Sequence, residues 1–135
     1  MIMDTSALLA YFDAGEPAHE AVSGAVESSG GPLVVSPYVL AELDYLLLTR
    51  HGPHAEQAVL AELGSGAWEL AAMGLDRVRA ATAVVVRYAE VPVGIADASC
   101  IVLGEAYRES VVATLDRRHF GVLRFADGSA PTIVP

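Results

Sequence analysis

The stretch VVATLDRRHF, residues 111–120, is the most informative segment for the fold. Its first five residues are mostly apolar or β-branched, which is typical of a buried strand, and Asp116 then begins a short helix or turn. A strand that is apolar on both faces belongs in a parallel sheet covered by helices. The segment therefore predicts an α/β fold with an acidic side chain directly after a strand.

Similar short apolar runs occur along the whole chain, and helical patterns separate them. We expect strands at Met1–Met3, Leu33–Val35, Ala67–Leu70, Val111–Leu115 and Thr132–Val134. Helices are expected over Thr5–Asp13, Pro17–Ser28, Pro37–Arg50, Pro53–Leu63, Asp76–Tyr88 and Ala96–Tyr107. Right-handed crossovers then predict a three-layer α/β/α sandwich around a mainly parallel sheet of about five strands.

Length and composition predict a single globular domain over residues 1–135, because domains usually contain about 100 to 150 residues. Hydrophobic residues make up 53% of the chain, which is enough for a sizeable core and excludes a disordered or fibrous protein. No apolar run approaches the roughly 18 residues of a membrane span, and no basic signal-peptide start is present. We therefore expect a cytoplasmic protein without a membrane partner.

The chain is strongly acidic, with 17 Asp and Glu residues against 8 basic residues and a net charge of −9. This charge argues against generic coating of nucleic acid, which depends on Lys and Arg contacts with phosphates. Carboxylates that converge on divalent cations would nevertheless form, with the metal, a phosphate-binding feature. Zinc is excluded as the metal, because Cys100 is the single cysteine and no His or Cys cluster has zinc spacing.

Four carboxylates are predicted at one edge of the sheet. The reactive crevice of an open α/β sheet lies beyond the carboxyl ends of its strands, where helix N-termini also gather. Asp4 and Asp116 directly follow strands, Asp97 opens a helix, and Glu42 lies about one and a half turns into another. Anions gathered in this way are unfavourable unless cations neutralise them, so we predict a divalent metal site.

Each of these carboxylates also has a purely structural interpretation. Asp4, Asp97 and Asp116 all stand where an aspartate can cap a helix. Glu42 can be a solvated helix residue, although its apolar and aromatic helical neighbours make burial of an unpaired carboxylate costly. Asp44 lies about 200° round the helix from Glu42, so only one of the two can face the site. We choose Glu42, partly because of the family pattern described next.

The acidic positions stand in motifs that resemble the PIN-domain ribonucleases, and more narrowly the VapC toxins of bacterial toxin–antitoxin pairs. The motifs are Asp4-Thr5-Ser6, Ser36-Pro37 with Ala41-Glu42-Leu43, Gly94-Ile95-Ala96-Asp97-Ala98, and Thr114-Leu115-Asp116-Arg117-Arg118-His119-Phe120. The resemblance runs from Met1 to Pro135. It implies an α/β/α domain, dependence on Mg²⁺ or Mn²⁺, endonucleolytic cleavage of RNA, inhibition by a VapB antitoxin, and a homodimer.

The resemblance also implies roles for individual residues. The catalytic set would be Asp4, Glu42, Asp97 and Asp116, of which the three aspartates would bind the metal that activates water for hydrolysis of structured RNA, with Thr5, Ser6 and Thr114 as supporting residues. Because side chains on a strand alternate, Thr114 shares a face with Asp116 and could hold that carboxylate or a metal-bound water in place, or serve only as a β-branched strand residue. Arg117, Arg118 and His119 directly follow Asp116 and are weaker candidates for RNA phosphate contacts, with a solvated turn as the alternative.

Two other classes of protein remain as alternatives. A catalytically silent PIN-fold module would only sequester an antitoxin, but the intact set of carboxylates argues against it. A phosphatase with an acidic site would also place an aspartate after its first strand, but such folds normally use a late lysine, and this chain contains no lysine. A metal-dependent cleavage assay on structured RNA discriminates among the three.

Overall fold

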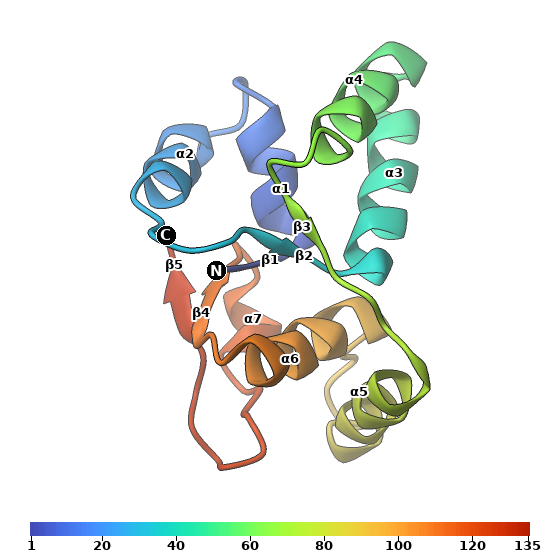
Figure 1. The fold of residues 1–135 in the computed structure, drawn as a ribbon, viewed down its shortest axis with the longest axis vertical. Helices are drawn as coiled ribbons and strands as arrows, with labels where there is room; N and C mark the ends of the chain where they lie inside the picture. Colours follow the sequence, from blue (N-terminus) through green and yellow to red (C-terminus); the bar gives the residue numbers. More distant parts are fainter.

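Five short parallel strands form the centre of the molecule, in a computed structural model that describes residues 1–135 (Figure 1). The strands are β1 (Ile2–Met3), β2 (Val34–Val35), β3 (Glu69–Leu70), β4 (Val111–Ala113) and β5 (Thr132–Val134). They pair in the order β3-β2-β1-β4-β5, and every pairing is parallel. All five predicted strands are thus confirmed.

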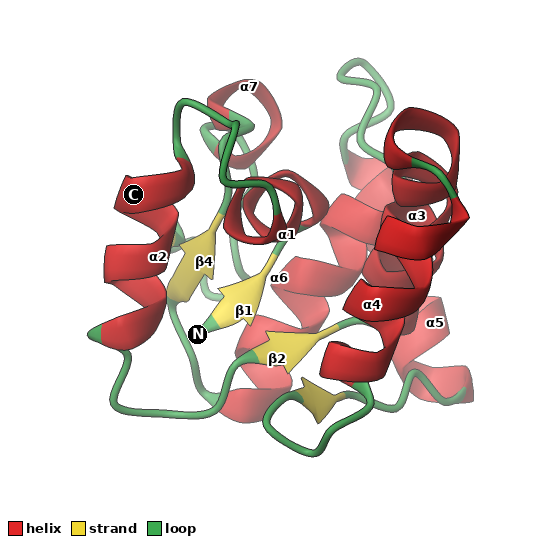
Figure 2. Ribbon diagram, turned by 90° about the horizontal axis from the view of Figure 1, so that it is seen from above, coloured by secondary structure: helices red, strands yellow, loops and turns green.

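Helices cover both faces of this sheet, which confirms the three-layer sandwich. They are α1 (Thr5–Phe12), α2 (His19–Glu27), α3 (Pro37–His51), α4 (Pro53–Leu63), α5 (Leu75–Arg87), α6 (Ile95–Tyr107) and α7 (Arg117–Phe120). Figures 1 and 2 show α1 to α4 on one face and α5 and α6 on the other, while the single turn α7 follows β4. None of these helices combines the length and apolar character that crossing a membrane requires.

Local chemistry explains where the long helix α3 begins and ends. The hydroxyl of Ser36 accepts a hydrogen bond from the backbone N–H of Tyr38, and Pro37 occupies the first turn, where its missing N–H costs nothing. At the other end, Gly52 adopts a φ of 84°, a left-handed conformation that glycine tolerates best. This glycine ends α3 and allows Pro53 to begin α4 at once.

The order of the strands decides where a functional crevice can lie. From β1 the chain winds outward through β2 to β3, and it then crosses back to β4 on the other side of β1. Ile2 is accordingly paired with Val34 on one side and with Val112 on the other. A reversal of this kind leaves a crevice beyond the carboxyl ends of the two strands involved. Asp4 and Asp116 follow these two strands.

The strand β4 is shorter than the apolar run that predicted it. Thr114 still donates its backbone N–H to Val134, but the N–H of Leu115 turns to the hydroxyl of Ser6 and that of Asp116 to the hydroxyl of Thr114. These side-chain acceptors replace the strand partners, so the regular strand ends at Ala113. The segment that leaves the sheet is therefore the one that reaches the crevice.

Candidate active site

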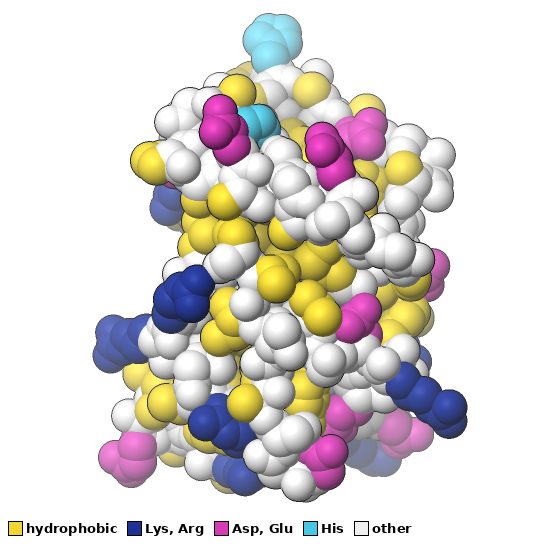
Figure 3. All heavy atoms as spheres, turned by 90° about the vertical axis from the view of Figure 1, so that its left-hand side faces the viewer, with side chains coloured by type: hydrophobic (Ala, Val, Ile, Leu, Met, Phe, Trp, Pro, Cys, Tyr) yellow, Lys and Arg dark blue, Asp and Glu magenta, His cyan; other side chains and the backbone are white.

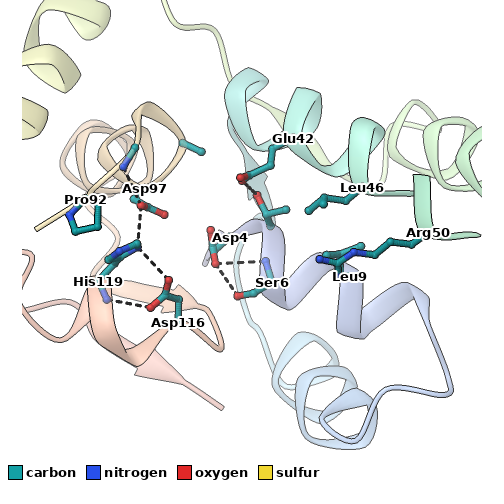
Figure 4. A pocket seen from close by; sticks show the side chains of 13 residues that line it. Asp4, Ser6, Leu9, Glu42, Leu46, Arg50, Pro92, Asp97, Asp116 and His119 are labelled. Carbon is teal, nitrogen blue, oxygen red and sulfur yellow. Dashed lines mark hydrogen bonds and ion pairs between the residues drawn. The ribbon is translucent and has the colours of Figure 1, made fainter. Parts of the chain in front are cut away.

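An open cavity of about 420 Å³ lies at the crevice between β1 and β4 (Figure 4). The structure brings all four predicted carboxylates to it, together with two of the three supporting residues. The lining consists of Asp4, Thr5, Ser6, Leu9, Glu42, Leu46, Arg50, Pro92, Gly94, Ala96, Asp97, Asp116 and His119. Thr114 is buried beneath the cavity.

Asp4 is the most deeply placed of the carboxylates, with only 3% of the residue exposed. It caps α1 and uses one oxygen for its bonds, because Ser6 Oγ and Thr114 Oγ1 donate to Oδ2 at 2.7 and 2.8 Å. Burial raises the pKa of Asp4 above its ordinary value, although these hydrogen bonds act in the opposite direction. The hydroxyls hold the carboxylate in one orientation and leave Oδ1 free of both.

Thr114 supports a different carboxylate from the one expected. Its hydroxyl donates to Asp4 and accepts the backbone N–H of Asp116 at 2.9 Å, so it does not bond the carboxylate of Asp116. The expectation that Thr114 holds the Asp116 side chain is therefore wrong. The reason is that β4 lies directly beside β1, which brings Thr114 against the Asp4 side chain. Thr114 thus links the two segments that carry Asp4 and Asp116.

Asp116 is the N-cap of α7, as its structural interpretation required, whereas Asp97 stands three residues after Gly94, the N-cap of α6, and its side chain bonds back to that residue. Asp97 Oδ2 accepts the backbone N–H of Gly94 at 3.1 Å, and Asp116 Oδ1 accepts those of Arg118 and His119 at 3.0 and 2.9 Å. Each cap uses one carboxylate oxygen, and the other is not needed for it. Capping and ligand binding are consequently compatible at both residues.

His119 lies between these two aspartates, so its ring faces carboxylates and not the RNA phosphate expected for it. Its Nδ1 is 3.2 Å from Asp97 Oδ2 and 3.0 Å from Asp116 Oδ2 (Figure 4). The signal in the sequence was its position three residues after Asp116, which places both side chains on one side of the short α7 turn. The imidazole takes the place where a cation would interact with both carboxylates.

Asp97 is a second lining carboxylate with a raised pKa. Burial is the main cause that raises its pKa to about 6, and the nearby charges of Asp4 and Asp116 add to the effect. The Gly94 N–H and the His119 ring oppose it. An ionised Asp97 therefore gains from a bound cation.

Glu42 is exposed despite its apolar and aromatic helical neighbours, because its face of α3 opens onto the cavity. Thr5 Oγ1 donates to Glu42 Oε2 at 2.6 Å and fixes the carboxylate beside Asp4. Asp44 does not line the cavity. The geometry thus favours Glu42 over Asp44 on this helix.

Arginines near the cavity are not arranged as expected. Neither Arg117 nor Arg118 lines it, and the guanidinium of Arg117 donates to the backbone oxygen of Pro135 at 2.7 Å. Arg50, which was not predicted, does line it. On the face that carries α2 and β5, Figure 3 shows arginines as separate groups and no continuous basic patch. That face offers no broad surface for coating nucleic acid.

The chemistry of the lining fits a hard divalent cation. Such ions prefer carboxylate oxygens and keep several waters, so a few aspartates suffice. Asp4 Oδ1, Asp97 Oδ1 and Asp116 Oδ2 lie outside the caps, and the last of these contacts His119. As the side chains stand, no three of them already form a ligand set, since His119 lies between Asp97 and Asp116.

Comparison with known proteins identifies the family. Residues 1–125 match the PIN domain family. Ribonuclease VapC26 of Mycobacterium tuberculosis (strain ATCC 25618 / H37Rv) is 56% identical over 135 residues, which cover 100% of both chains.

The crystal structure of Mycobacterium tuberculosis VapC20, described as a sarcin–ricin loop cleaving toxin, has a TM-score of 0.80 at 24% identity and covers 87% of this chain and 91% of its own. A toxin–antitoxin complex from Klebsiella pneumoniae has a TM-score of 0.69 at 16% identity and covers 98% of both chains, and these two likenesses concern the fold alone. The chain therefore belongs to the PIN domain family and, within it, to the VapC ribonuclease toxins of toxin–antitoxin systems.

Proposed function

We propose that this ribonuclease is a Mg²⁺-dependent endonuclease of structured RNA, that Mn²⁺ substitutes for Mg²⁺, and that Asp4, Asp97 and Asp116 hold the metal. The observation that carries the proposal is the convergence of these residues on one cavity, where the pKa of Asp97 is raised to about 6 mainly by burial. A site that disfavours the ionised form of a carboxylate in this way is suited to binding a cation. When bound, the ion would stabilise the negative charge that develops on the phosphate and would make water a better nucleophile near neutral pH.

The remaining residues orient the reacting groups. Glu42 is the only one of the four carboxylates that is exposed, and Thr5 fixes it beside Asp4, so we propose that Glu42 accepts a proton from the attacking water. Ser6 and Thr114 are positioning residues, because both act through Asp4 Oδ2. Arg117 and Arg118 are exposed beyond Asp116, and we propose at most a contact of Arg118 with flanking RNA.

We also propose the partners of the protein. Family membership suggests that a VapB-type antitoxin inhibits it, that it acts as a homodimer, and that it works in the cytoplasm. Four carboxylates in one cavity attract a cation when metal is absent. An arginine of the antitoxin that reaches into the cavity would satisfy them and block the site.

The test of this function is a cleavage assay on a defined RNA. A hairpin carrying the sarcin–ricin loop is the first substrate to try, because that loop is what VapC20 is described as cleaving. We expect a discrete 5′-labelled product with Mg²⁺ or Mn²⁺, none with chelator, and at least about 100-fold slower cleavage for Asp97→Asn.

The same assay separates the alternatives. A silent binding module would cut no RNA at any metal concentration yet bind its antitoxin, and a phosphatase would release phosphate from a small phosphomonoester without cutting the chain. Unchanged cleavage by Asp97→Asn would refute the assignment of the metal site.

A further inference from the structure

One stripe of α3 lines one side of the cavity and ends in a positive charge. Glu42, Leu46 and Arg50 are spaced by four residues and all line the cavity. At a rise of about 1.5 Å per residue, the backbone of Arg50 lies about 12 Å along the helix axis from that of Glu42. Figure 4 shows Arg50 on the side of the cavity away from Asp97 and His119.

The guanidinium of Arg50 is free. Five of the eight arginines have partners: Arg77 with the oxygen of Ala72, Arg79 with Asp76, Arg87 with the Tyr88 ring, Arg117 with Pro135, and Arg124 with Gly121 and Leu123. Arg50, Arg108 and Arg118 have no such contact. Of these three, only Arg50 lines the cavity that holds the carboxylates.

Arg50 does not neutralise the acidic residues around it, because it forms no ion pair with any of them. Figure 4 shows its side chain extending from α3 towards Leu9 and Ser6, at the end of the cavity away from Asp97. A phosphate next to one held at the aspartates would reach it, and Leu9 and Leu46 offer apolar contact for the intervening sugar or base. Arginine binds phosphate through a planar fork of donors, and phosphate contacts position a nucleic acid on a protein.

We propose that Arg50 binds a backbone phosphate of the RNA next to the one that is cleaved, and so sets the direction in which the strand crosses the cavity. The inference rests on the proposed ribonuclease site. In this proposal Arg50 binds the substrate and takes no part in the cleavage of the phosphodiester bond. A structural role is the competing explanation, since Arg50 lies in the last turn of α3, where a positive charge favours the helix dipole.

The test measures single-turnover cleavage of the same hairpin RNA at increasing enzyme concentration, which separates the half-saturating concentration from the maximal rate. Arg50→Gln should raise the half-saturating concentration about 10-fold and leave the maximal rate close to wild type. The same series is repeated at several salt concentrations. The slope of log affinity against log salt should then be smaller for Arg50→Gln than for wild type by about 0.7 to 0.9, the value of one phosphate contact.

Arg79→Gln is the matched control, because it removes the same charge from an exposed residue of α5 outside the cavity. It should keep the wild-type affinity and slope. Arg50→Lys retains the charge but loses the fork, so it should keep the slope with an intermediate affinity. Thermal melts of all three variants report on the dipole explanation.

Equal half-saturating concentrations and salt slopes for Arg50→Gln and Arg79→Gln would overturn the inference. So would a lower maximal rate of Arg50→Gln with an unchanged half-saturating concentration. A lower melting temperature of Arg50→Gln with a wild-type salt slope would assign Arg50 to helix stability instead. If the wild-type protein cuts no RNA, the proposed ribonuclease function is refuted. That outcome is distinct from the three above, which all require an active wild-type enzyme.

Discussion

Single carboxylates in this protein serve two purposes through their two oxygens. Asp97 accepts the N–H of Gly94 through Oδ2, and Oδ1 takes no part in this cap. A capping role and a metal-binding role are often treated as exclusive when a sequence is interpreted. Here one aspartate stabilises its helix and still offers an oxygen to the cavity, so substitutions should separate the two roles.

Replacing Asp97 with Asn should do so, because the amide oxygen of asparagine can still accept the Gly94 N–H but the side chain lacks the charge. Without metal, the variant should melt at or above the wild-type temperature, since repulsion from Asp4 and Asp116 is relieved. Mg²⁺ at about 100 times its dissociation constant should stabilise the wild type by about 2.7 kcal/mol, or several degrees, and the variant by much less. Thermal melts with chelator and with millimolar Mg²⁺ at fixed ionic strength provide the measurement. An equal rise in both proteins would show that Asp97 does not hold the ion.

Glu42 and Asp44 provide a matched pair on one helix. Glu42→Gln should slow cleavage by about 100-fold if Glu42 takes the proton, because the amide cannot accept it. Asp44→Asn, which makes the same change of charge outside the cavity, should stay within about two-fold of wild type. Initial rates of hairpin cleavage measure both. The reverse order would show that the other face of α3 carries the function.

At the scale of elements, α6 is pressed against the C-terminal segment at Gly104. A Cβ at this position would lie 2.8 Å from Phe125 Cε1 and 2.9 Å from the backbone oxygen of Glu109. Gly104→Ala should therefore destabilise the fold by about 1 to 3 kcal/mol. Urea denaturation gives this free energy of unfolding.

Gly24 in α2 is the control for this helix glycine, because nothing lies within 4 Å of its Cβ position. Gly24→Ala should stabilise the protein by about 0.5 to 1 kcal/mol, since alanine loses less backbone entropy in a helix. Destabilisation by both variants would mean that helix packing at α2 is tighter than the structure shows.

Elements were easier to predict than the contacts between them. Apolar runs such as Val111–Ala113 and prolines at helix starts such as Pro37 are local signals, so the strands and helices were found within a few residues. The strand order was not predicted, because several orders satisfy the same right-handed crossovers. The partner of Thr114 depended on that order, and the expectation for it was accordingly wrong.

The candidate site shows the same division between local and long-range information. Its carboxylates follow strands or begin helices, and their positions were therefore predictable. Arg50 and His119 gain their meaning only from neighbours brought together by the fold. Their spacing from Glu42 and Asp116 places them on the same helix faces as these carboxylates, but no pattern in the sequence indicated that their side chains would reach the cavity.

For the whole molecule, the amino group of Met1 joins the first strand to the segment before β4. It donates to Glu109 Oε2 at 2.8 Å, and Glu109 also accepts the N–H of Val111. Partial burial acts to raise the pKa of Glu109, but these bonds lower it below its ordinary value of 4.5. A carboxyl with a lowered pKa adds stability above its ordinary pKa, and this stability is lost as the pH falls through the folded value.

Glu109→Gln should therefore be less stable than wild type at pH 7, by up to about 1 kcal/mol. The difference should shrink as the pH falls below 4.5 and vanish once wild-type Glu109 is protonated. Urea denaturation from pH 7 to pH 3 measures it, with Glu90→Gln as an exposed control for the lost charge. A difference that stays constant over this range would exclude the ion pair as its origin.

The bond between Asp4 and Thr114 joins residues 110 positions apart, and this separation matters while the protein is being made. The first strand leaves the ribosome long before β4 exists, so an emerging chain has neither the hydroxyl that orients Asp4 nor Asp116 itself. A chain that stops before residue 111 lacks the second half of the crevice altogether. On the proposed role of Asp116, an emerging chain should be unable to cut RNA until almost all of it has been translated, so it should spare its own messenger during its synthesis.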